Sequence, residues 1–375
     1  MKNLETLIQE LCSHGVEFVK LGEVCVVQRG KRLTKKQLSD SDKFPVFHGG
    51  IQPIGYYSEK NRDANTVMII NVGASAGTIG YSDKEFWSSD GCYCLSHVDS
   101  VVPKYIYYLL ANNQHYFQAK VRHGGIPTLD ALVVKNYEIP LPPIEVQTEI
   151  VRILDKFTLL EAELEAELDC RKRQYEYYRD KLLSFDNVGG QDVEWKKMNE
   201  VCVNCDSKRK AVTGAKRESG NIPYYGASGI VDYVKDYIFD GDYLLVSEDG
   251  ANLLARNTPI AFSIKGKNWV NNHAHVLKFD NLTSQKFVEY YLNSICLSTW
   301  ISGAAQPKLN QENLSRIPIP IPPLAEQHRI VSILDRFESL TTSLQSGLPA
   351  EIAARRQQYE HYRDKLLTFK RKGVA

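Results

Sequence analysis

The chain repeats itself at half its own length. The segment IPLPPIEVQTEIVRILDKF at residues 139–157 returns as IPIPPLAEQHRIVSILDRF at 319–337, and eleven of the nineteen positions are identical. A second pair, QYEYYRDKLLSF at 174–185 and QYEHYRDKLLTF at 358–369, differs at only two positions. Self-similarity over such a distance predicts that one structural unit occurs twice in the polypeptide. Any fold for this chain must therefore accommodate two copies of the same arrangement.

Shorter matches extend the repeat over most of the remaining sequence. EVCV at 23–26 returns at 200–203, and KYIYYLL at 104–110 aligns with KFVEYYL at 286–292. The offset between the copies drifts from 177 to 184 residues, so short insertions separate the matched segments. Because insertions are tolerated mainly in surface loops, the copies should share a framework and differ in their loops.

Each copy begins with a segment of mixed character. Residues 18–138 and 194–316 are rich in Tyr, Val, Ile, Gly and Asn, with short alternating runs such as TVMIINVG and DYLLVSEDG. Short strands between polar turns predict two mixed α/β domains, here termed heads. A chain of 375 residues, of which 43% are hydrophobic, is long enough for both heads to have their own cores.

Each copy then continues into a long helical region. An extended approach at Pro142 and Pro143 precedes a helix predicted over 144–185, which would reach about 60 Å at roughly 1.5 Å per residue. Its apolar residues follow at three- and four-residue spacing, interrupted by Glu161 and Arg171. This stripe consists of Ile150, Leu154, Phe157, Leu164, Leu168, Tyr175, Tyr178, Leu182 and Phe185.

The second helical region keeps the stripe but contains an insertion, GLPA at 347–350. Gly347 and Pro349 are expected to end one helix and start another. Each stripe is too long for its own head to cover, so the two regions should pack on each other as an antiparallel coiled-coil spacer between the heads. A short amphipathic helix is expected against the far end of that bundle through Leu4, Leu7, Ile8 and Leu11.

The repeated linker and helix are similar to those of one known family. IPLPPIEVQTEIVRILDKF followed by RKRQYEYYRDKLLSF, returning after QPKLN and IPIPIPPLAEQ, resembles the specificity subunits of type I restriction–modification systems over essentially the whole chain. The resemblance implies an α+β fold with pseudo-two-fold symmetry, in which two target-recognition domains are separated by two long antiparallel helices. It also implies a non-catalytic subunit whose heads each read one half of a split, asymmetric DNA target. One departure is the GLPA turn, which the first helical region lacks.

The resemblance also implies partners and a division of the chain. Two methyltransferase subunits are expected to dock on the repeated helical regions, and restriction subunits to join that complex. S-adenosylmethionine, Mg²⁺ and ATP are expected only on those partners. The expected segments are residues 1–143 for the N-terminal helix and first head, 144–186 for the first helical region, 187–322 for the second head and 323–375 for the second helical region.

Local charge points to nucleic acid although the net charge does not. Lys and Arg number 46 against 45 for Asp and Glu, so the chain as a whole has no general attraction to DNA. RGKRLTKK at 29–36 and KRKAVTGAKR at 208–217 nevertheless hold five cations each. Cations placed twice at one structural position suit contacts with DNA phosphates, and two solvated loops are the alternative. At an offset of 177 residues, the coinciding cations are Lys31 with Lys208 and Arg32 with Arg209.

Base recognition needs polar groups on loops that enter a groove of the duplex. HGGIQPIGYY at 48–57 and GASGIVDYV at 226–234 are candidates because glycine lets backbone approach DNA closely, as are the turns at 122–125 and 302–308. Ordinary turn chemistry is the alternative for each residue. The candidate DNA contacts are Lys31, Arg32, Lys35, Lys36, His48, Gly49, Gly50, Arg122, His123, Lys208, Arg209, Lys210, Ser228, Asn252, Arg256, Asn271, His273 and Lys308. His275 is a further polar residue of the second head that is expected to extend toward the duplex.

Motifs of other chemistries are weaker. GASAG at 73–77 matches the nucleophile elbow of hydrolases, but an elbow leads into a helix and strand-like residues follow here. LPPI at 141–144 lacks the polar and aromatic residues with which methyltransferases hold a flipped base. C-x-C at 92–94 and C-x-x-C at 202–205 do not occupy matched repeat positions, which favours buried structural thiols over a zinc site.

Two polar residues have open roles. Gln147 and Gln327 follow the prolines at matched sites, where they suit helix capping or a docking surface for a methyltransferase. For the whole chain, the alternative function is a coiled-coil adaptor whose heads bind proteins. The neutral net charge is compatible with an adaptor, whereas the aligned basic loops speak against it.

The sequence shows no membrane or export segment. No apolar run approaches the roughly 20 residues that cross a bilayer, and MKNLETLIQELCSHG does not read as a signal peptide. A cytoplasmic protein is therefore expected, with its eight cysteines reduced.

Overall fold

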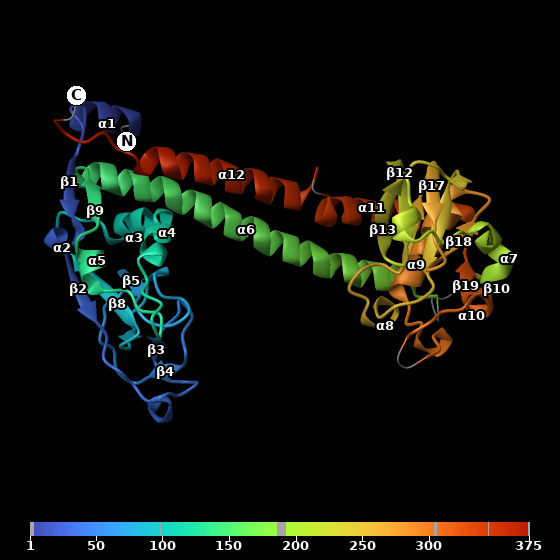
Figure 1. Ribbon diagram of the computed structural model, residues 1–375, viewed down its shortest axis with the longest axis horizontal. Coiled ribbons are helices and arrows are strands. Elements are labelled where there is room, and N and C mark those ends of the chain that lie inside the picture. The colour runs from blue at the N-terminus through green and yellow to red at the C-terminus, as the bar shows by residue number, and fades with distance from the viewer. Residues whose placement is uncertain (1–3, 98, 186–192, 304–305, 344, 374–375) are drawn as a thin grey trace. The chain divides into compact units, whose positions relative to one another are not determined.

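The protein folds into two compact units, each built around one head (Figure 1). The first unit combines residues 1–164 with 352–375, and the second consists of residues 165–351. This grouping differs from four consecutive segments, because each helical region contributes a part to each unit. The computed structural model describes residues 4–97, 99–185, 193–303, 306–343 and 345–373.

The first head is built on two small sheets. An antiparallel sheet has the order β2-β8-β5-β6, and its central strand β5 is buried at every position, as the apolar run TVMII requires. A second sheet has the order β4-β3-β7, with β3 and β7 parallel. The strands are β1 Glu17–Lys20, β2 Cys25–Arg29, β3 Phe44–Phe47, β4 Tyr56–Tyr57, β5 Thr66–Ile70, β6 Ile79–Ser82, β7 Trp87–Ser88, β8 Cys92–His97 and β9 Glu138–Leu141, and β1 pairs with β9.

The second head repeats this topology and adds one strand, β14, to the edge of its smaller sheet. Its antiparallel sheet has the order β11-β18-β15-β16, and its other sheet, β13-β12-β17-β14, again contains one parallel pair, β12 with β17. The duplication read from the sequence is therefore confirmed at the level of sheet order. The strands are β10 Glu194–Lys197, β11 Val203–Asn204, β12 Ser219–Gly226, β13 Gly229–Val234, β14 Phe239–Asp240, β15 Tyr243–Ser247, β16 Ala261–Ile264, β17 Lys267–Val270, β18 Ala274–Lys278 and β19 Pro318–Ile321, and β10 pairs with β19.

One helix in each head packs on the antiparallel sheet. Helix α3 (Pro103–Asn112) starts with proline in its first turn, where the missing N–H costs nothing, and α9 (Leu282–Ser294) starts at Asn281, whose side chain accepts a hydrogen bond from the N–H of Ser284. The shorter helices of the heads are α2 Leu21–Val24, α4 Gln114–Ala119, α5 Ala131–Lys135, α7 Met198–Val201, α8 Asn252–Ala255 and α10 Gln311–Arg316, with 3-10 turns η1 Lys35–Gln37, η2 Asp206–Lys208, η3 Gly214–Lys216 and η4 Ser298–Trp300.

The helical regions have the lengths expected from the sequence. Helix α6 runs over Ile144–Leu183, and the second region is divided into α11 (Leu324–Thr342) and α12 (Leu348–Leu367). The division is located at Gly347, as predicted. Gly347 has φ +122°, and a Cβ there would lie 2.6 Å from the carbonyl oxygen of Ser339, so no other residue type fits without a local shift.

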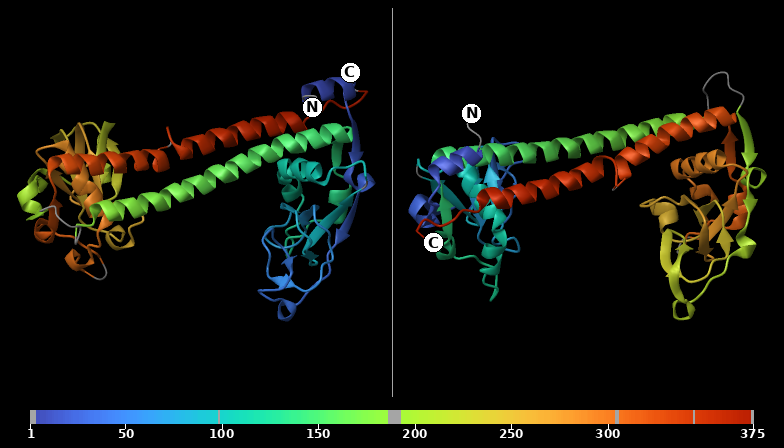
Figure 2. Two further views of the ribbon diagram at one scale, coloured as in Figure 1. Left: turned by 180° about the vertical axis from the view of Figure 1, so that it is seen from behind. Right: turned by 90° about the horizontal axis from the view of Figure 1, so that it is seen from above.

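Within each unit, a part of α6 packs antiparallel to a helix of the second region. In the first unit, the ring of Phe157 lies 5.6 Å from that of Tyr362, and Arg356 pairs with Glu161. In the second unit, the ring of Tyr178 lies 5.7 Å from that of Phe337. Figures 1 and 2 show α12 alongside the first part of α6 in every view. The predicted side-by-side helices are thus observed in both units.

The helices also enter the core of each head. Ile150 and Leu154 of α6 are fully buried in the first core, and Leu334 of α11 is fully buried in the second. Gln147 and Gln327 are buried as well, with side chains that donate to the carbonyl oxygens of Pro142 and Pro322 at 2.8 Å. Of the two roles open to these glutamines, the structural one accounts for their position.

The N-terminal helix α1 (Leu4–Leu11) packs in the first unit. Leu4 is buried in the first core, which also includes Leu367 at the end of α12. Leu7 and Ile8 are partly buried against it, whereas Leu11 remains 46% exposed and does not join the interface as expected. The backbone of Val16 pairs with that of Arg371, so the segment after α1 lies beside the segment after α12.

Candidate nucleic-acid interface

The first basic cluster lies on the loop that leaves β2. The backbone N–H of Lys31 donates to the carbonyl oxygen of Ser88 at 2.9 Å, so the loop runs beside β7. Gly30 is required before it, because a Cβ at this position would lie 2.1 Å from the carbonyl oxygen of Ser89. Four predicted phosphate contacts follow, all with exposed side chains: Lys31, Arg32, Lys35 and Lys36.

Other loops of the first head meet the basic loop at one end of the sheets. The N–H of Ser89 donates to the carbonyl oxygen of Phe47 at 2.9 Å, and the N–H of Asn71 donates to that of Gly91 at 3.1 Å. Backbone bridges from residue 72 and from residue 122 to Thr128 add a further loop. We refer to these segments together as the first loop cluster: residues 30–36, 48–50, 71–77, 88–91 and 122–128.

The first loop cluster contains every DNA contact predicted for the first head. His48 is exposed, with Nδ1 3.4 Å from the carboxylate of Asp90, and the adjacent Gly49 and Gly50 are half-buried. The side chain of Arg122 is 71% exposed, and His123 beside it is also exposed. Predicted contacts from three separate parts of the sequence are thus gathered in one loop cluster.

The second head has an equivalent loop cluster. The N–H of Lys210 donates to the carbonyl oxygen of Val270 at 3.2 Å, and the N–H of Asn271 donates to that of Tyr225 at 3.0 Å. Asp249 and Lys308 are joined by a backbone bridge that matches the one at Thr128. The second loop cluster comprises residues 208–217, 226–229, 248–252, 270–273 and 302–308, of which 304 and 305 lie outside the described residues.

Five predicted contacts of the second head have exposed side chains in its loop cluster. Lys208, Lys210 and Ser228 are exposed on their loops. His273 and Lys308 are about half exposed, and each lies beside a carboxylate: the Nδ1 of His273 is 2.8 Å from Asp249, and the Nζ of Lys308 is 3.1 Å from Glu248. The second cluster therefore presents cations, imidazole and carboxylates together.

The structure corrects the pairing of the two basic loops. Lys31 donates to Ser88, the strand residue paired with Phe47, and Lys210 donates to Val270, the strand residue paired with Tyr225. Lys31 is therefore equivalent to Lys210, at an offset of 179 residues. The prediction that Lys31 pairs with Lys208 and Arg32 with Arg209 was therefore wrong by two residues. The residue offset between the two copies changes between the EVCV segment and the basic loop.

Two further predicted contacts have side chains turned into the protein. The guanidinium of Arg256 donates to the carbonyl oxygens of Leu292 and Ile295, where it caps the C-terminus of α9. Asn271 is only 6% exposed, and its Oδ1 accepts a hydrogen bond from the N–H of its neighbour His273. Neither is free to contact DNA, so both are better described as supports of the loops.

Asn252 has a similar local role. Its side chain accepts from the N–H of Thr258 at 3.1 Å and donates to the carbonyl oxygen of the same residue at 2.9 Å. This pair of bonds closes the segment that contains α8. Asn252 is half-buried, so most of its hydrogen-bonding capacity is used inside the head.

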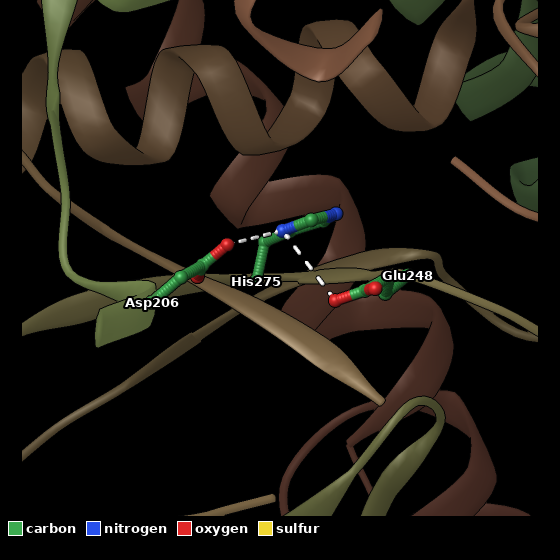
Figure 3. A group of neighbouring side chains, drawn as sticks. All are labelled: Asp206, Glu248 and His275. Atoms are coloured by element: carbon green, nitrogen blue, oxygen red, sulfur yellow. Dashed lines mark hydrogen bonds and ion pairs between the residues drawn. The ribbon is translucent and has the colours of Figure 1, made fainter. Parts of the chain in front are cut away.

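The base of the second loop cluster contains a buried charged group (Figure 3). The Nδ1 of His275 lies 2.6 Å from the carboxylate of Asp206 and 3.8 Å from that of Glu248. Its Nε2 lies 2.8 Å from the carbonyl oxygen of Leu309, so both ring nitrogens face oxygen acceptors. His275 is fully buried and supports the loops instead of extending from them.

Arg209 belongs to this buried group and not to the DNA-facing surface. Its guanidinium is 2.6 Å from Glu248 and 3.2 Å from Asp206, and its side chain is only 13% exposed. Burial is the largest single influence on Asp206 and raises its pKa, but the hydrogen bond and charge of His275, the N–H of Val276 and the charge of Arg209 together outweigh burial, so the pKa is lowered. Burial likewise raises the pKa of Glu248 most, but the hydrogen bonds from Arg209 and Lys308, together with the nearby charges of His275 and Arg209, lower it overall.

Asp206, Glu248 and His275 offer donor atoms within 4.8 Å of one another, as a metal site would. Cationic side chains already occupy their carboxylates, however: Arg209 contacts both, and Lys308 contacts Glu248. A divalent ion would have to displace them. The group is therefore best described as a network of ion pairs and hydrogen bonds that joins strand β18 to three loops.

The first head has no such network at the equivalent positions. By strand register, Asn71 takes the place of Glu248, and Tyr93 takes the place of His275. The hydroxyl of Tyr93 donates to the carbonyl oxygen of Leu129, as His275 contacts that of Leu309.

Sequence reasoning missed Asp206 and Glu248. The available signal was His275 itself, a polar residue inside the buried run AHVLK, since a buried histidine needs partners.

The remaining motifs have structural positions. Residues 73–77 form a turn that leads into strand β6 and not into a helix, so the arrangement of a nucleophile elbow is absent at this site. Cys92 and Cys94 are buried in β8, and burial raises the pKa of Cys92 to about 12. Cys202 is half-buried, with a pKa that burial likewise raises to about 12.

Within the described residues, every helix is too short or too polar to span a bilayer.

Comparisons with known proteins agree with this architecture. A family model described as the type I restriction modification DNA specificity domain matches residues 13–169 and again 190–354. The crystal structure of a type I restriction–modification S subunit from M. genitalium has the same fold, with a TM-score of 0.63 at 18% identity over 94% of this chain and 96% of that chain.

One of the sequence relatives matches almost the whole length. The chain is 32% identical to the specificity subunit of the type I restriction enzyme EcoR124I/EcoR124II from Escherichia coli, over 94% of each protein. It is 42% identical to a putative type I specificity subunit, S.HindORF215P, from Haemophilus influenzae, and that match covers 48% of this chain and 47% of the relative. With two matched domains and a full-length relative, the chain belongs to the family of type I restriction–modification specificity subunits.

Proposed function

We propose that this protein is the DNA-recognition subunit of a type I restriction–modification complex, in which each head reads one half of a bipartite target. The observation that carries this proposal is the loop cluster, which occurs in each head with exposed cations beside glycine-bearing turns. Cations bind phosphates and position a reader, whereas polar groups on neighbouring turns can reach base edges. Family membership favours this function over the coiled-coil adaptor.

The target should be asymmetric because the two loop clusters carry different chemistry. The second cluster presents His273 beside Asp249, and Lys308 beside Glu248. Thr128 occupies the position of Lys308 in the first cluster. Different donors and acceptors at equivalent positions select different base edges, so the two half-sites should not form a palindrome.

The helical regions are proposed to set the spacing of the half-sites and to bind two methyltransferase subunits. Matched exposed apolar residues support two equivalent docking surfaces: Ile144 is 42% and Leu324 is 55% exposed, and Tyr178 is 38% and Tyr362 is 39% exposed. Restriction subunits would join that complex. S-adenosylmethionine, Mg²⁺ and ATP would bind to the partner subunits, and this chain would contribute recognition alone.

Methylation mapping of the host genome would identify the two half-sites directly. A gel shift with that duplex, in the presence of the methyltransferase subunit and at increasing salt, then tests the function. A recognition subunit should shift the mapped duplex in preference to a scrambled one, with an affinity that falls steeply with salt. An adaptor would give no sequence-dependent shift.

A further inference from the structure

Two of the four tryptophans in the chain occupy equivalent positions beside the basic loops. Trp87 lies in β7, opposite Val46 of a parallel neighbour, and Trp269 lies in β17, opposite Tyr224 of a parallel neighbour. The indole Nε1 of Trp87 donates to the carbonyl oxygen of Lys31 at 2.8 Å. The Nε1 of Trp269 donates to the carbonyl oxygen of Lys210 at 2.6 Å. The same bond thus forms in both heads.

The peptide groups on both sides of each lysine are therefore held. The N–H of Lys31 is bonded to Ser88 and its carbonyl oxygen to Trp87, while Lys210 is bonded in the same way to Val270 and Trp269. In each head, one strand therefore holds the lysine backbone at two points. The carbonyl oxygen of Ser88 or Val270 accepts from the lysine N–H, and the indole of the tryptophan one residue earlier in the strand donates to the lysine carbonyl oxygen. This two-point attachment determines where the lysine backbone lies.

The side chains of the two lysines remain available. Both are exposed, and in the described part of the chain neither forms an ion pair or a side-chain hydrogen bond. A fixed backbone with a free ammonium group suits a phosphate contact, because less conformational entropy is lost when the contact forms. Arg32 and the equivalent Ala211 differ, so the lysine and its tryptophan are what the two loops share at this point.

The rest of each basic loop is held by different means. In the second head, the N–H of Val212 donates to the hydroxyl of Tyr224, and the guanidinium of Arg217 lies 4.3 Å from the ring of that tyrosine. In the first head, Thr34 and Gln37 close the turn η1 by mutual hydrogen bonds. Because these supports differ between the heads, the two bonds to the lysine, from the strand carbonyl and from the indole, are the elements of loop positioning that both heads share.

We propose that Trp87 and Trp269 are positioning residues for DNA binding, each holding one lysine, Lys31 or Lys210, where its ammonium group meets a phosphate. This inference rests on the proposed function and adds to it a matched pair of phosphate contacts. The tryptophans act through the lysines and do not need to touch DNA. A purely packing role would require the ring but not the Nε1–H.

A double-mutant cycle tests the inference in the first head. W87F keeps an aromatic ring and removes the donor, K31Q removes the charge, and the double variant combines them. The full-length chain with its methyltransferase subunit is titrated with a fluorescein-labelled duplex carrying the mapped target, at several salt concentrations. K31Q should weaken binding about fivefold and reduce the slope of log affinity against log salt by roughly one. W87F should have a smaller effect in the same direction.

The decisive result is the coupling between the two changes. If the indole acts through the lysine, W87F should cost little further affinity once Lys31 has been replaced. Fully additive losses, or a W87F variant that binds with the affinity and salt slope of the unchanged protein, would overturn the inference. W195F is the matched control, since Trp195 packs against Tyr291 away from the basic loop and should leave binding unchanged.

The second head provides an independent cycle with W269F and K210Q. Trp269 is less buried than Trp87, so W269F remains informative if W87F fails to fold. The same coupling is expected, and additive losses there would equally contradict the inference. Failure of the proposed function has a different signature: the unchanged protein would then bind the mapped and scrambled duplexes alike.

Discussion

Arg209 illustrates how one position can take different roles in two copies of a fold. In the first head the equivalent residue is Gly30, which must be glycine because the chain passes against Ser89. In the second head the equivalent Arg209 has a mostly buried side chain, and its guanidinium contacts Asp206 and Glu248. The same position of the basic loop therefore holds a structural cation in one head and a close backbone contact in the other.

Replacing Arg209 should destabilise the second head. Arg209→Met leaves Asp206 and Glu248 buried without their shared cation, and breaking such a buried group costs about 3 kcal/mol. The free energy of unfolding is measured by urea denaturation, with hydrogen exchange in β15 and β18 as the probe of this head. Lys208→Met, at an exposed neighbour, should cost less than about 0.5 kcal/mol. Equal losses for both variants would contradict the assignment of Arg209 to a buried network.

The lowered pKa values of Asp206 and Glu248 predict an acid-sensitive second head. A group whose pKa is lower in the folded state adds stability above its ordinary value, and that stability is lost as the pH falls through the folded value. The ordinary values are 3.8 and 4.5, so the loss should begin below about pH 4.5. The protection factors of amides in β15 and β18, which compare the hydrogen-exchange rate with the intrinsic rate at the same pH, should fall there, and Arg209→Met should flatten the dependence. An unchanged pH profile in that variant would argue against the network.

At the scale of elements, each head is joined to a helix by a tyrosine. The hydroxyl of Tyr108 in α3 donates to Asp155 of α6, and that of Tyr290 in α9 contacts Asp335 of α11 at 2.6 Å. Burial, reinforced by these carboxylates, raises the pKa of both tyrosines, so the hydroxyls stay protonated as donors. The joint between head and helix is thus the same in both units.

Removing the hydroxyl of Tyr290 should loosen this joint. Tyr290→Phe leaves the ring in the core but removes the contacts with Asp335 and Glu338, which should cost about 1–2 kcal/mol. Thermal unfolding of the full chain and hydrogen exchange in α11 report the effect. Tyr233→Phe is the control, because Tyr233 is 51% exposed on β13. A Tyr290→Phe variant as stable as the control would show that packing alone maintains the joint.

At the scale of the whole molecule, α6 connects the two heads through a continuous helix of 40 residues. If the helical regions set the half-site spacing, lengthening them should change the spacing and nothing else. Seven residues inserted after Leu164, matched by seven in the connection between α11 and α12, preserve the apolar stripe and add about 10 Å. This length corresponds to roughly 3 base pairs.

Methylation mapping with the lengthened protein checks this expectation. The unread spacer should increase by about 3 base pairs while both half-sites stay the same. An insertion after Glu59, an exposed residue in a loop of the first head, is a control that should leave the spacer unchanged. Altered half-sites in the lengthened protein would rule out a spacing role for the helices.

Local patterns in the sequence determined the elements and their duplication. The apolar stripe after Pro143 predicted a helix over 144–185, and α6 covers Ile144–Leu183. Gly347 and Pro349 predicted the break between α11 and α12, because glycine conformation and proline chemistry act within a few residues. Repetition of the pattern predicted two heads, since similar local sequences adopt similar elements.

Only the tertiary structure decided which polar residues face outward. Lys208 and Arg209 are adjacent in the sequence, yet one is exposed and the other is buried among Asp206, Glu248 and His275. Burial of a loop side chain depends on residues from distant segments that pack against it. The local sequence pattern contains no information about those residues. For the same reason, the equivalence of Lys31 with Lys210 could be established only from strand pairing. Paired strands align the two heads residue by residue, whatever insertions lie in the loops between them.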